Sequence, residues 1–355
     1  MCEIFQYRLG IIFSRKVFAM KTRWQIVVGI LVSGVALVAI LHGISWGDVG
    51  REMANGNYWW LIPFVLLEGL SLWARAKRWK VLLEDRMETS RLFWLTGISY
   101  HLSNILPLRI GEVVKIYLAT KNSEIRGMQV VSSVLLERMI DVVVVFLMLF
   151  AVLPFVPYPS DLIGLTYWLV GLVSGGMVAL FLVARKREVM VGIVRRICGY
   201  LSGKLGRVMG NGVDQLLLSI QRISMGRLVK AFLLGFVTWL TAALASYVLL
   251  LGFLPGKSLY VGIFVTAIVA LGIAIPSVPG SLGLWEAATV GALAIFGVRK
   301  EIALSYAVAM HLAIFIQMMV LGMIGLYREG ENIKHLAKDA RQFLAILKND
   351  GGRVA

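Results

Sequence analysis

Asn104-Ile-Leu-Pro-Leu-Arg-Ile-Gly-Glu112 connects two apolar segments, residues 92–106 and 112–119. Proline removes a backbone donor and glycine relaxes the backbone, so a helix is predicted to break here. In hydrocarbon, a broken backbone is tolerated only where protein or a water-filled cavity satisfies its polar groups. Charged side chains at that depth are costly and usually functional. We therefore predict a re-entrant hairpin that lines a polar site.

A second stretch, Pro276-Ser-Val-Pro-Gly-Ser-Leu-Gly-Leu-Trp-Glu286, has the same character far downstream. It is again a proline and glycine break, and its glutamate is placed to open a new half-helix, where a carboxylate complements the helix dipole. Two such breaks, each inside an apolar region, indicate an internal repeat.

The composition is that of an integral membrane protein. Of the 355 residues, 59% are hydrophobic and 16% are charged, and the mean hydropathy is +0.80. A soluble core cannot hide this much apolar surface. The formal net charge of +16 is expected to come from Lys and Arg in cytoplasmic loops, beside anionic lipid headgroups. We therefore expect no nucleic-acid partner.

The sequence also argues against a cofactor or metal. Cys2 and Cys198 both fall in segments predicted to be cytoplasmic, where a disulfide is disfavoured. No cluster of metal ligands has usable spacing, and no Walker A sequence indicates an ATP motor. We expect no cofactor.

The order of apolar and basic segments predicts an all-α polytopic membrane protein with six full spans and two re-entrant hairpins. Basic residues, among them Lys115, Lys121 and Arg126, are expected on the cytoplasmic side. Residues 46–57 are expected to form an outer loop. Eight spans stay open as an alternative, because each half of the second hairpin is long enough to cross. The predicted spans are 24–41, 58–74, 128–155, 162–184, 231–253 and 302–327, and the predicted hairpins are 92–120 and 258–297.

These elements form a single membrane domain, 1–355, made of two halves. The half-repeats, 24–156 and 162–327, would start on opposite sides of the membrane, which gives the inverted repeat common in transporters. A basic cytoplasmic connector, 185–230, is expected between them, and an amphipathic cytoplasmic tail, 328–355, after them. The protein is expected to lie in the cell membrane, with both termini on the cytoplasmic side.

Four motifs in a fixed order resemble a known family. They are Arg75-Ala-Lys-Arg-Trp-Lys-Val-Leu-Leu83, Asn104-x-Leu-Pro-x-Arg-x-Gly-Glu112, Leu136-Glu-Arg-x-x-Asp141 and Pro279-Gly-Ser-Leu-Gly-x-x-Glu286. The chain resembles the lysylphosphatidylglycerol synthase transmembrane family, a flippase-like membrane domain, from about residue 24 to about residue 327. It is similar to the membrane domain of the multiple peptide resistance factor.

The resemblance implies a protein that moves a phospholipid or a lipid-linked glycan between leaflets. We expect no enzymatic lysyl transfer, because no aminoacyl-transferase domain follows the last predicted span. Two alternatives stay open: a membrane-embedded enzyme acting on a lipid headgroup, and a non-catalytic scaffold for a lipid-modifying enzyme or glycosyltransferase. Anionic lipids are expected partners, and a homo-oligomer stays open. The substrate, the direction of transport and the energy source are not specified by these motifs.

The first group of candidate substrate-binding residues comes from the first half. Arg109 is expected to hold a phosphate with its forked guanidinium, and Glu112 to bind a cationic headgroup or exchange salt bridges. The alternative is a buried structural pair. Asn104 is expected to accept a hydrogen bond from a backbone group that the helix break leaves without a partner, or simply to cap a helix. The other members are Glu137 and Asp141, four residues apart on one helix face, and Arg138, three residues from Asp141. They are expected to form a second charged cluster, which could relay protons, and the alternative is a clamp between helices made by Arg138 and Asp141.

The second group mirrors the first. Gly280, Gly283 and Glu286 are the candidates in the downstream break. Three residues, Arg75, Arg78 and Trp79, are expected as anchors at the cytoplasmic interface. Other polar residues in apolar segments are Glu68, His101 and His311, of which each histidine is expected to be a packing residue before a proton carrier.

Overall fold

The computed structural model describes residues 29–106, 110–121, 123–157, 223–275 and 277–332, with isolated positions within 164–176 and 336–339. Every secondary-structure element in these ranges is a helix, as the composition predicts. The predicted span 162–184, connector 185–230 and tail 328–355 lie largely outside the described residues, and so does Arg109.

The first described helix, Gly29–Leu41, meets helix α2, Trp46–Asn55, at an angle of 86°. The expectation of a loop over 46–57 was therefore wrong. Polar residues suggested the loop, but α2 carries Asp48 in its first turn, where a carboxylate complements the helix dipole. Residues Tyr58–Trp60 form the short helix η1, and Asn57 caps it by accepting from the Trp59 backbone N–H.

Helix α3, Leu61–Leu82, continues well past the predicted end of the second span. Helices α4, Thr89–Ile105, and α5, Ile110–Thr120, follow it and confirm the first helix break. Leu106 is already extended, with φ −96° and ψ 141°. Helix α6, Gly127–Val152, then matches the predicted third span and ends in the short helix η3, Leu153–Phe155.

The second half has the same kind of break. Helix α10 is Met225–Phe253, and α11 is Leu259–Gly272. The short helix η4, Pro279–Ser281, and helix α12, Leu284–Ala294, follow, before α13, Lys300–Glu329. Gly280 and Gly283 have φ values of 71° and 85°, a region where glycine avoids the strain of a Cβ atom. The second predicted break is therefore confirmed.

Within the described residues, three helices are long and apolar enough to cross a membrane: Gly127–Phe155, Met225–Phe253 and Lys300–Glu329. The bent pair of Gly29–Leu41 and α2 makes a fourth if it counts as one crossing. A polytopic all-α membrane protein agrees with this. The predicted count of six or eight spans stays a prediction, and so does the inverted repeat.

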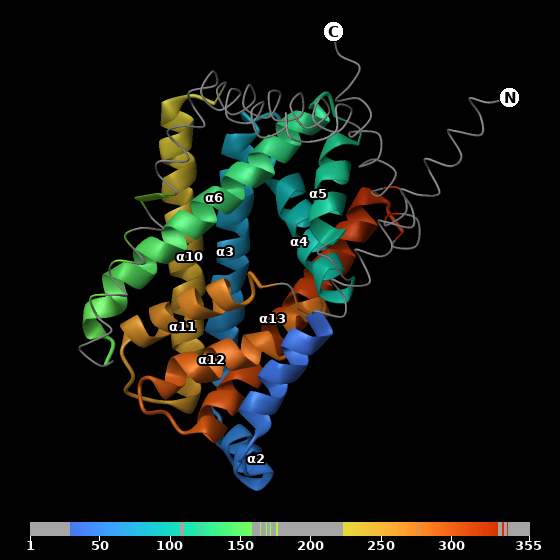
Figure 1. Ribbon diagram of the computed structural model, residues 1–355. Coiled ribbons are helices and arrows are strands. Elements are labelled where there is room, and N and C mark those ends of the chain that lie inside the picture. The colour runs from blue at the N-terminus through green and yellow to red at the C-terminus, as the bar shows by residue number, and fades with distance from the viewer. Residues whose placement is uncertain are drawn as a thin grey trace, which may run out of the picture.

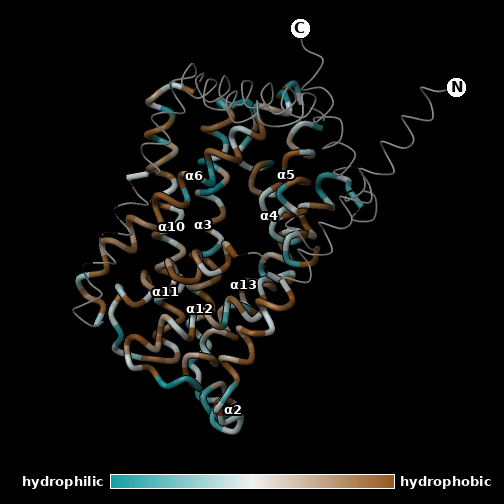
Figure 2. The backbone as a smooth tube through the Cα atoms, in the orientation of Figure 1, coloured by the Kyte–Doolittle hydropathy of each residue, from teal (hydrophilic) through white to brown (hydrophobic). Residues whose placement is uncertain are grey.

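Helices α3 and α10 lie side by side through the middle of the bundle (Figure 1). Helices α4 and α5 occupy the upper part of this view, while α11 and α12 occupy the lower part. The end of α4 contacts η4, so the two breaks approach one another. Figure 2 shows that hydrophobic residues dominate the helices and that hydrophilic residues gather at α2.

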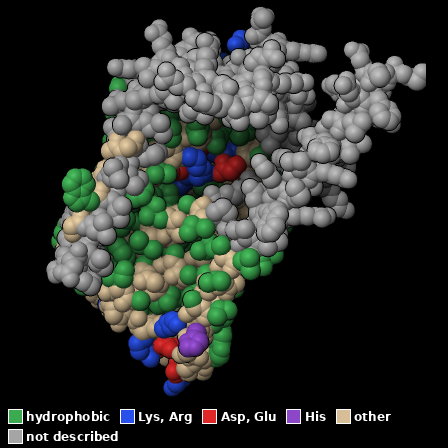
Figure 3. Space-filling model, in the orientation of Figure 1, with side chains coloured by type: hydrophobic (Ala, Val, Ile, Leu, Met, Phe, Trp, Pro, Cys, Tyr) green, Lys and Arg blue, Asp and Glu red, His purple; other side chains and the backbone are tan. Residues whose placement is uncertain are grey.

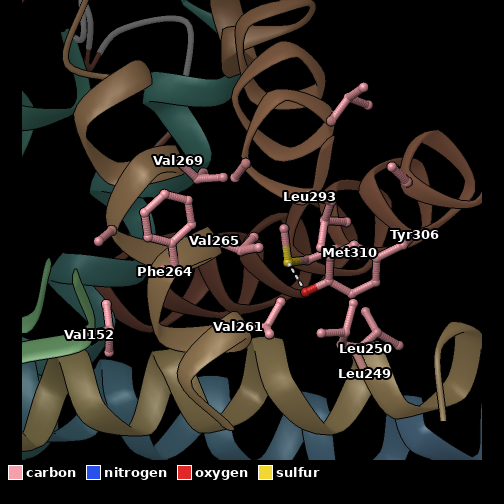
Figure 4. Packing of buried hydrophobic residues seen from close by; sticks show 14 of the residues in the cluster. Val152, Leu249, Leu250, Val261, Phe264, Val265, Val269, Leu293, Tyr306 and Met310 are labelled. Carbon is pink, nitrogen blue, oxygen red and sulfur yellow. Dashed lines mark hydrogen bonds between the residues drawn. The ribbon is translucent and has the colours of Figure 1, made fainter. Parts of the chain in front are cut away.

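Two packing features hold this arrangement. The lower helices bury a cluster that includes Val265 of α11, Leu293 of α12 and Leu249 of α10, and the hydroxyl of Tyr306 contacts the sulfur of Met310 within it (Figure 4). Between α4 and α13 the backbones approach closely, because a Cβ atom at Gly322 would lie 2.2 Å from the Cβ atom of His101.

Candidate functional site

A buried ion-pair network joins α3, α5 and α6. Arg78 donates from Nη1 to Asp141 Oδ1 over 2.7 Å and from Nη2 to Glu137 Oε1 over 3.0 Å. Arg75 donates from Nη1 to Asp141 Oδ2 over 2.9 Å, and Lys115 donates from Nζ to Glu137 Oε2 over 2.8 Å. Buried charges need partners and hydrogen bonds of this kind to offset their desolvation.

Helical spacing explains how the network forms. Glu137 and Asp141 are four residues apart on α6, and Arg75 and Arg78 are three apart on α3, so each pair lies on one helix face. Trp79 follows them and donates from Nε1 to Ser133 Oγ over 2.9 Å. Lys115 also lies 3.9 Å from the centre of the Trp79 ring.

This geometry corrects one expectation. Arg75, Arg78 and Trp79 were expected as interfacial anchors, yet they are 8%, 0% and 0% exposed. The positive-inside pattern suggested a surface position, but α3 continues through these residues and turns them toward the α6 carboxylates. Lys115 of α5 is 1% exposed because it also faces an α6 carboxylate, Glu137. Its expected place on the cytoplasmic side stays a prediction.

A fourth cation links the first break to α6. Arg138 pairs with Glu112 at the start of α5, and its Nη1 lies 3.5 Å from Asp141 Oδ2. Arg138 and Asp141 both belong to α6, so their contact lies within one helix and is not the clamp between helices that was considered. The described network thus has one more cation than carboxylates, and its members are Arg75, Arg78, Lys115 and Arg138 against Glu112, Glu137 and Asp141. Figure 3 shows acidic and basic side chains together on the middle of one face.

A cavity of about 210 Å³ lies beside this network. Arg75 faces it from α3, and Tyr100 and Asn104 face it from α4. From the second half, Gly280 and His311 contribute to the wall. Residues of both halves therefore surround one space, next to the point where the breaks approach, and its wall is mostly apolar with a few polar groups. The lining also includes Glu68, Ser71, Trp239, Ala242, Ser246, Thr266, Ser281 and Trp285.

Glu286 anchors the second break. Its Oε2 accepts from the Gly283 backbone N–H over 2.7 Å, as expected of a capping glutamate. Its Oε1 lies 2.6 Å from His311 Nδ1, and His311 Nε2 lies 2.9 Å from the Gly280 carbonyl oxygen. The Trp285 and His311 rings stack with centroids 4.9 Å apart. All three candidate residues of this break, Gly280, Gly283 and Glu286, therefore lie together.

The structure brings together residues that sequence analysis did not connect. Tyr100 and Trp239 flank Arg75, with ring centres 5.9 Å and 5.6 Å from its guanidinium carbon. Trp239 also donates from Nε1 to Asp141 Oδ1 over 2.8 Å. No local motif marks these aromatic residues. Within the part of the chain that the structure describes, no group of three His, Cys, Asp or Glu residues is placed to hold a metal ion.

Comparisons with known proteins agree with the four motifs. The family model for the lysylphosphatidylglycerol synthase TM region matches residues 26–322. The comparisons with curated proteins and with solved structures found no match. Because the family model covers most of the chain, including both breaks and the buried network, the chain belongs to the lysylphosphatidylglycerol synthase TM-region family.

Proposed function

We propose that this protein moves a phospholipid or a lipid-linked glycan across the cytoplasmic membrane, without an enzymatic step of its own. The observation that carries the proposal is the cavity between the two breaks, whose largely apolar wall carries polar groups at Arg75 and Asn104 from one half and at Gly280 and His311 from the other. Polar groups inside a membrane bundle usually mark a substrate path. The headgroup would cross through this space while the acyl chains stay in the bilayer.

The charge of the network suits an anionic phosphate. The described cations outnumber the described carboxylates by one, and Arg75 is the cation of the network that also lines the cavity. A guanidinium binds phosphate oxygens with its fork of donors. We propose that Arg75 takes the role expected of Arg109, or shares it, while the pair of Glu112 and Arg138 sets the position of the first hairpin.

The apolar exterior suits a protein that releases lipid sideways into the bilayer. Large hydrophobic side chains are exposed along three different helices, among them Leu66 at 69%, Leu233 at 59% and Ile316 at 53%. In the inverted-repeat arrangement that we propose, the two hairpins would open alternately to the two sides, with both termini cytoplasmic.

The ion pairing of the buried carboxylates favours transport over catalysis on the headgroup. Glu137 and Asp141, the residues that an acid/base mechanism would use, are held in ion pairs with Arg75, Arg78 and Lys115. A general acid or base must be free to exchange a proton with substrate. We therefore propose no catalytic role for either residue.

Leaflet exchange of fluorescent phospholipids, measured with purified protein in liposomes, tests the proposal. The wild type is expected to accelerate exchange, and Arg75→Gln to slow it by at least about tenfold, since one lost charge-assisted hydrogen bond is worth about 1.5–3 kcal/mol. Arg86→Gln is the matched control, because Arg86 is half exposed, at 51%, and pairs only locally with Glu84. A folded wild type that exchanges none of the lipids tried, a lipid-linked glycan included, would contradict the proposal.

A further inference from the structure

His311 has an acceptor opposite each of its ring nitrogens. Nδ1 faces a carboxylate oxygen of Glu286 at 2.6 Å, and Nε2 faces the carbonyl oxygen of Gly280 at 2.9 Å. The His311 and Glu286 side chains are each 10% exposed. A neutral imidazole has one N–H donor and one bare nitrogen, so it can satisfy only one of these two acceptors.

The geometry therefore requires an additional proton. One arrangement is an imidazolium that donates to both acceptors. The other is a protonated Glu286 that donates to Nδ1, while Nε2–H donates to Gly280. Both arrangements hold one proton more than a neutral histidine beside a carboxylate. Without that proton, two lone pairs would face each other across a buried hydrogen-bond distance, at a cost comparable to a buried unsatisfied group.

This proton ties several parts of the second break together. Gly280 belongs to η4, and its φ of 71° turns the backbone at that point. Glu286 also caps the start of α12 through the Gly283 N–H. His311 stands on α13, which packs against α4. Loss of the proton would therefore leave only one of the two hydrogen bonds between His311 and the hairpin. The hairpin would be loosened next to where η4 meets Asn104, whose carbonyl oxygen would lie 3.6 Å from a Cβ atom at Gly280.

We infer that His311 and Glu286 form a proton-binding site in the wall of the cavity, whose occupancy fixes the second hairpin against α13. The coupling of this proton to lipid movement rests on the proposed function. In that scheme, the bound proton holds the hairpin closed on one side of the membrane. Its release into the cavity frees the hairpin to move, so that one proton is exchanged in each transport cycle and no bond other than that to the proton changes.

The other charged and titratable groups around the site fit this role. Glu68 and Arg75 line the same cavity from α3, and Tyr100 lines it from α4. On α13 itself, Tyr306 is buried and bonded to Ser246. The lining residues of α10 and α11 in the described part of the chain are not titratable. The charge of Glu68 interacts with that of Arg75, and its place in the same wall makes its carboxylate the acceptor that we propose for the released proton.

Thermal unfolding of the purified full chain at several pH values tests the site without any lipid assay. The proton-bound pair stabilises the fold, so this contribution is present at low pH and is lost as pH rises. As the pH is raised far enough to remove the proton, the apparent Tm of the wild type is expected to fall by roughly 3 °C more than that of His311→Gln, which has no proton to lose.

Two further variants make this result specific. In Glu286→Gln, the carboxamide oxygen accepts from Gly283 N–H and the carboxamide N–H donates to Nδ1, so the contact persists without a proton. We expect its Tm to be as high as that of the wild type at low pH and to lack the same fall. His42→Gln, at an exposed histidine outside the cavity, should keep the wild-type fall. Equal falls in the wild type, His311→Gln and Glu286→Gln would overturn the inference.

A pH gradient across liposomes tests the coupling with fluorescent phosphatidylglycerol as the probe. The gradient is expected to bias the leaflet distribution of the probe with wild-type protein and to have no effect with Glu286→Gln. If the pH gradient does not change lipid exchange, while the Tm still falls as expected with rising pH, the proton site would stand and its coupling to lipid movement would be overturned. An absence of exchange of every lipid tried, a lipid-linked glycan included, with an intact Tm result would overturn the proposed function and leave the site itself standing.

Discussion

Lys115 of α5 donates to Glu137 of α6 over 2.8 Å, with side chains 2% and 0% exposed. This contact fixes the second arm of the first hairpin to the helix that follows it. Because Glu137 also bonds Arg78 of α3, one carboxylate joins three helices on one side of the cavity. The position of the hairpin therefore depends on a buried ionic contact as well as on apolar packing.

Removing Lys115 should be costly. Lys115→Met keeps the length and the apolar stem but leaves Glu137 with one cation fewer, and we expect a loss of about 3–5 kcal/mol, as for one broken partner of a buried pair. Unfolding of the purified protein in detergent measures this. Lys121→Met, at a pair with Glu331 whose lysine is 39% exposed, should cost about 1 kcal/mol or less. Equal costs for the two variants would contradict the structural role of Lys115.

The close contact between α4 and α13 allows a glycine test. Gly322→Ala adds a Cβ atom 2.2 Å from that of His101, so the helices must separate, and we expect a loss of at least about 1–3 kcal/mol from overpacking. Gly291→Ala in α12 adds a Cβ atom with no atom within 4 Å. It should be neutral or stabilise by about 0.5–1 kcal/mol through helix propensity. Unfolding measurements should therefore show a loss of stability for Gly322→Ala and no loss for Gly291→Ala.

The second break depends on both backbone conformation and space. Gly283 has φ 85°, and a Cβ atom there would lie 2.8 Å from the Ser33 carbonyl oxygen. Gly297 has φ 69° but open space around it. We expect Gly297→Ala to lose only the conformational term, about 1–2 kcal/mol. Gly283→Ala should lose more unfolding free energy than this and should also slow lipid exchange. A similar stability for the two variants would show that crowding at the break is unimportant.

The contact between Glu112 and Arg138 predicts rescue by charge reversal. Glu112→Arg alone places two cations together, and Arg138→Glu alone places two carboxylates together, so each single variant should slow leaflet exchange. The double variant restores an opposite-charge pair and should recover part of the activity, with a coupling of about 0.5–3 kcal/mol in the double-mutant cycle. Independent effects of the two substitutions would rule out this pairing as a determinant of hairpin position.

The breaks were predictable from the sequence, because their causes are local. Proline and glycine act on their own backbone, and they end α4 and shape η4 where the sequence places them. The capping role of Glu286 was predictable for the same reason, since its partner Gly283 is three residues away. The all-α architecture followed from composition alone.

The pairing of charges was not predictable, because it depends on contacts between distant helices. Arg75 and Arg78 stand in a basic segment, which the positive-inside rule assigns to a surface, yet their partners on α6 are about sixty residues further along the chain. His311 has no motif around it, and only the fold brings it to Glu286. The polar residues of α2 also led to the wrong prediction of a loop at this helix.

The central claim is that the headgroup crosses through the cavity between the two breaks. Ala242→Trp, in the cavity wall on α10, tests it most directly when leaflet exchange of fluorescent lipids is measured in liposomes. Leu233→Trp adds a similar ring on the same helix at a position that is 59% exposed. We predict that Ala242→Trp abolishes exchange in a folded protein while Leu233→Trp leaves it unchanged. Exchange at the wild-type rate with the cavity filled by Ala242→Trp would contradict the account.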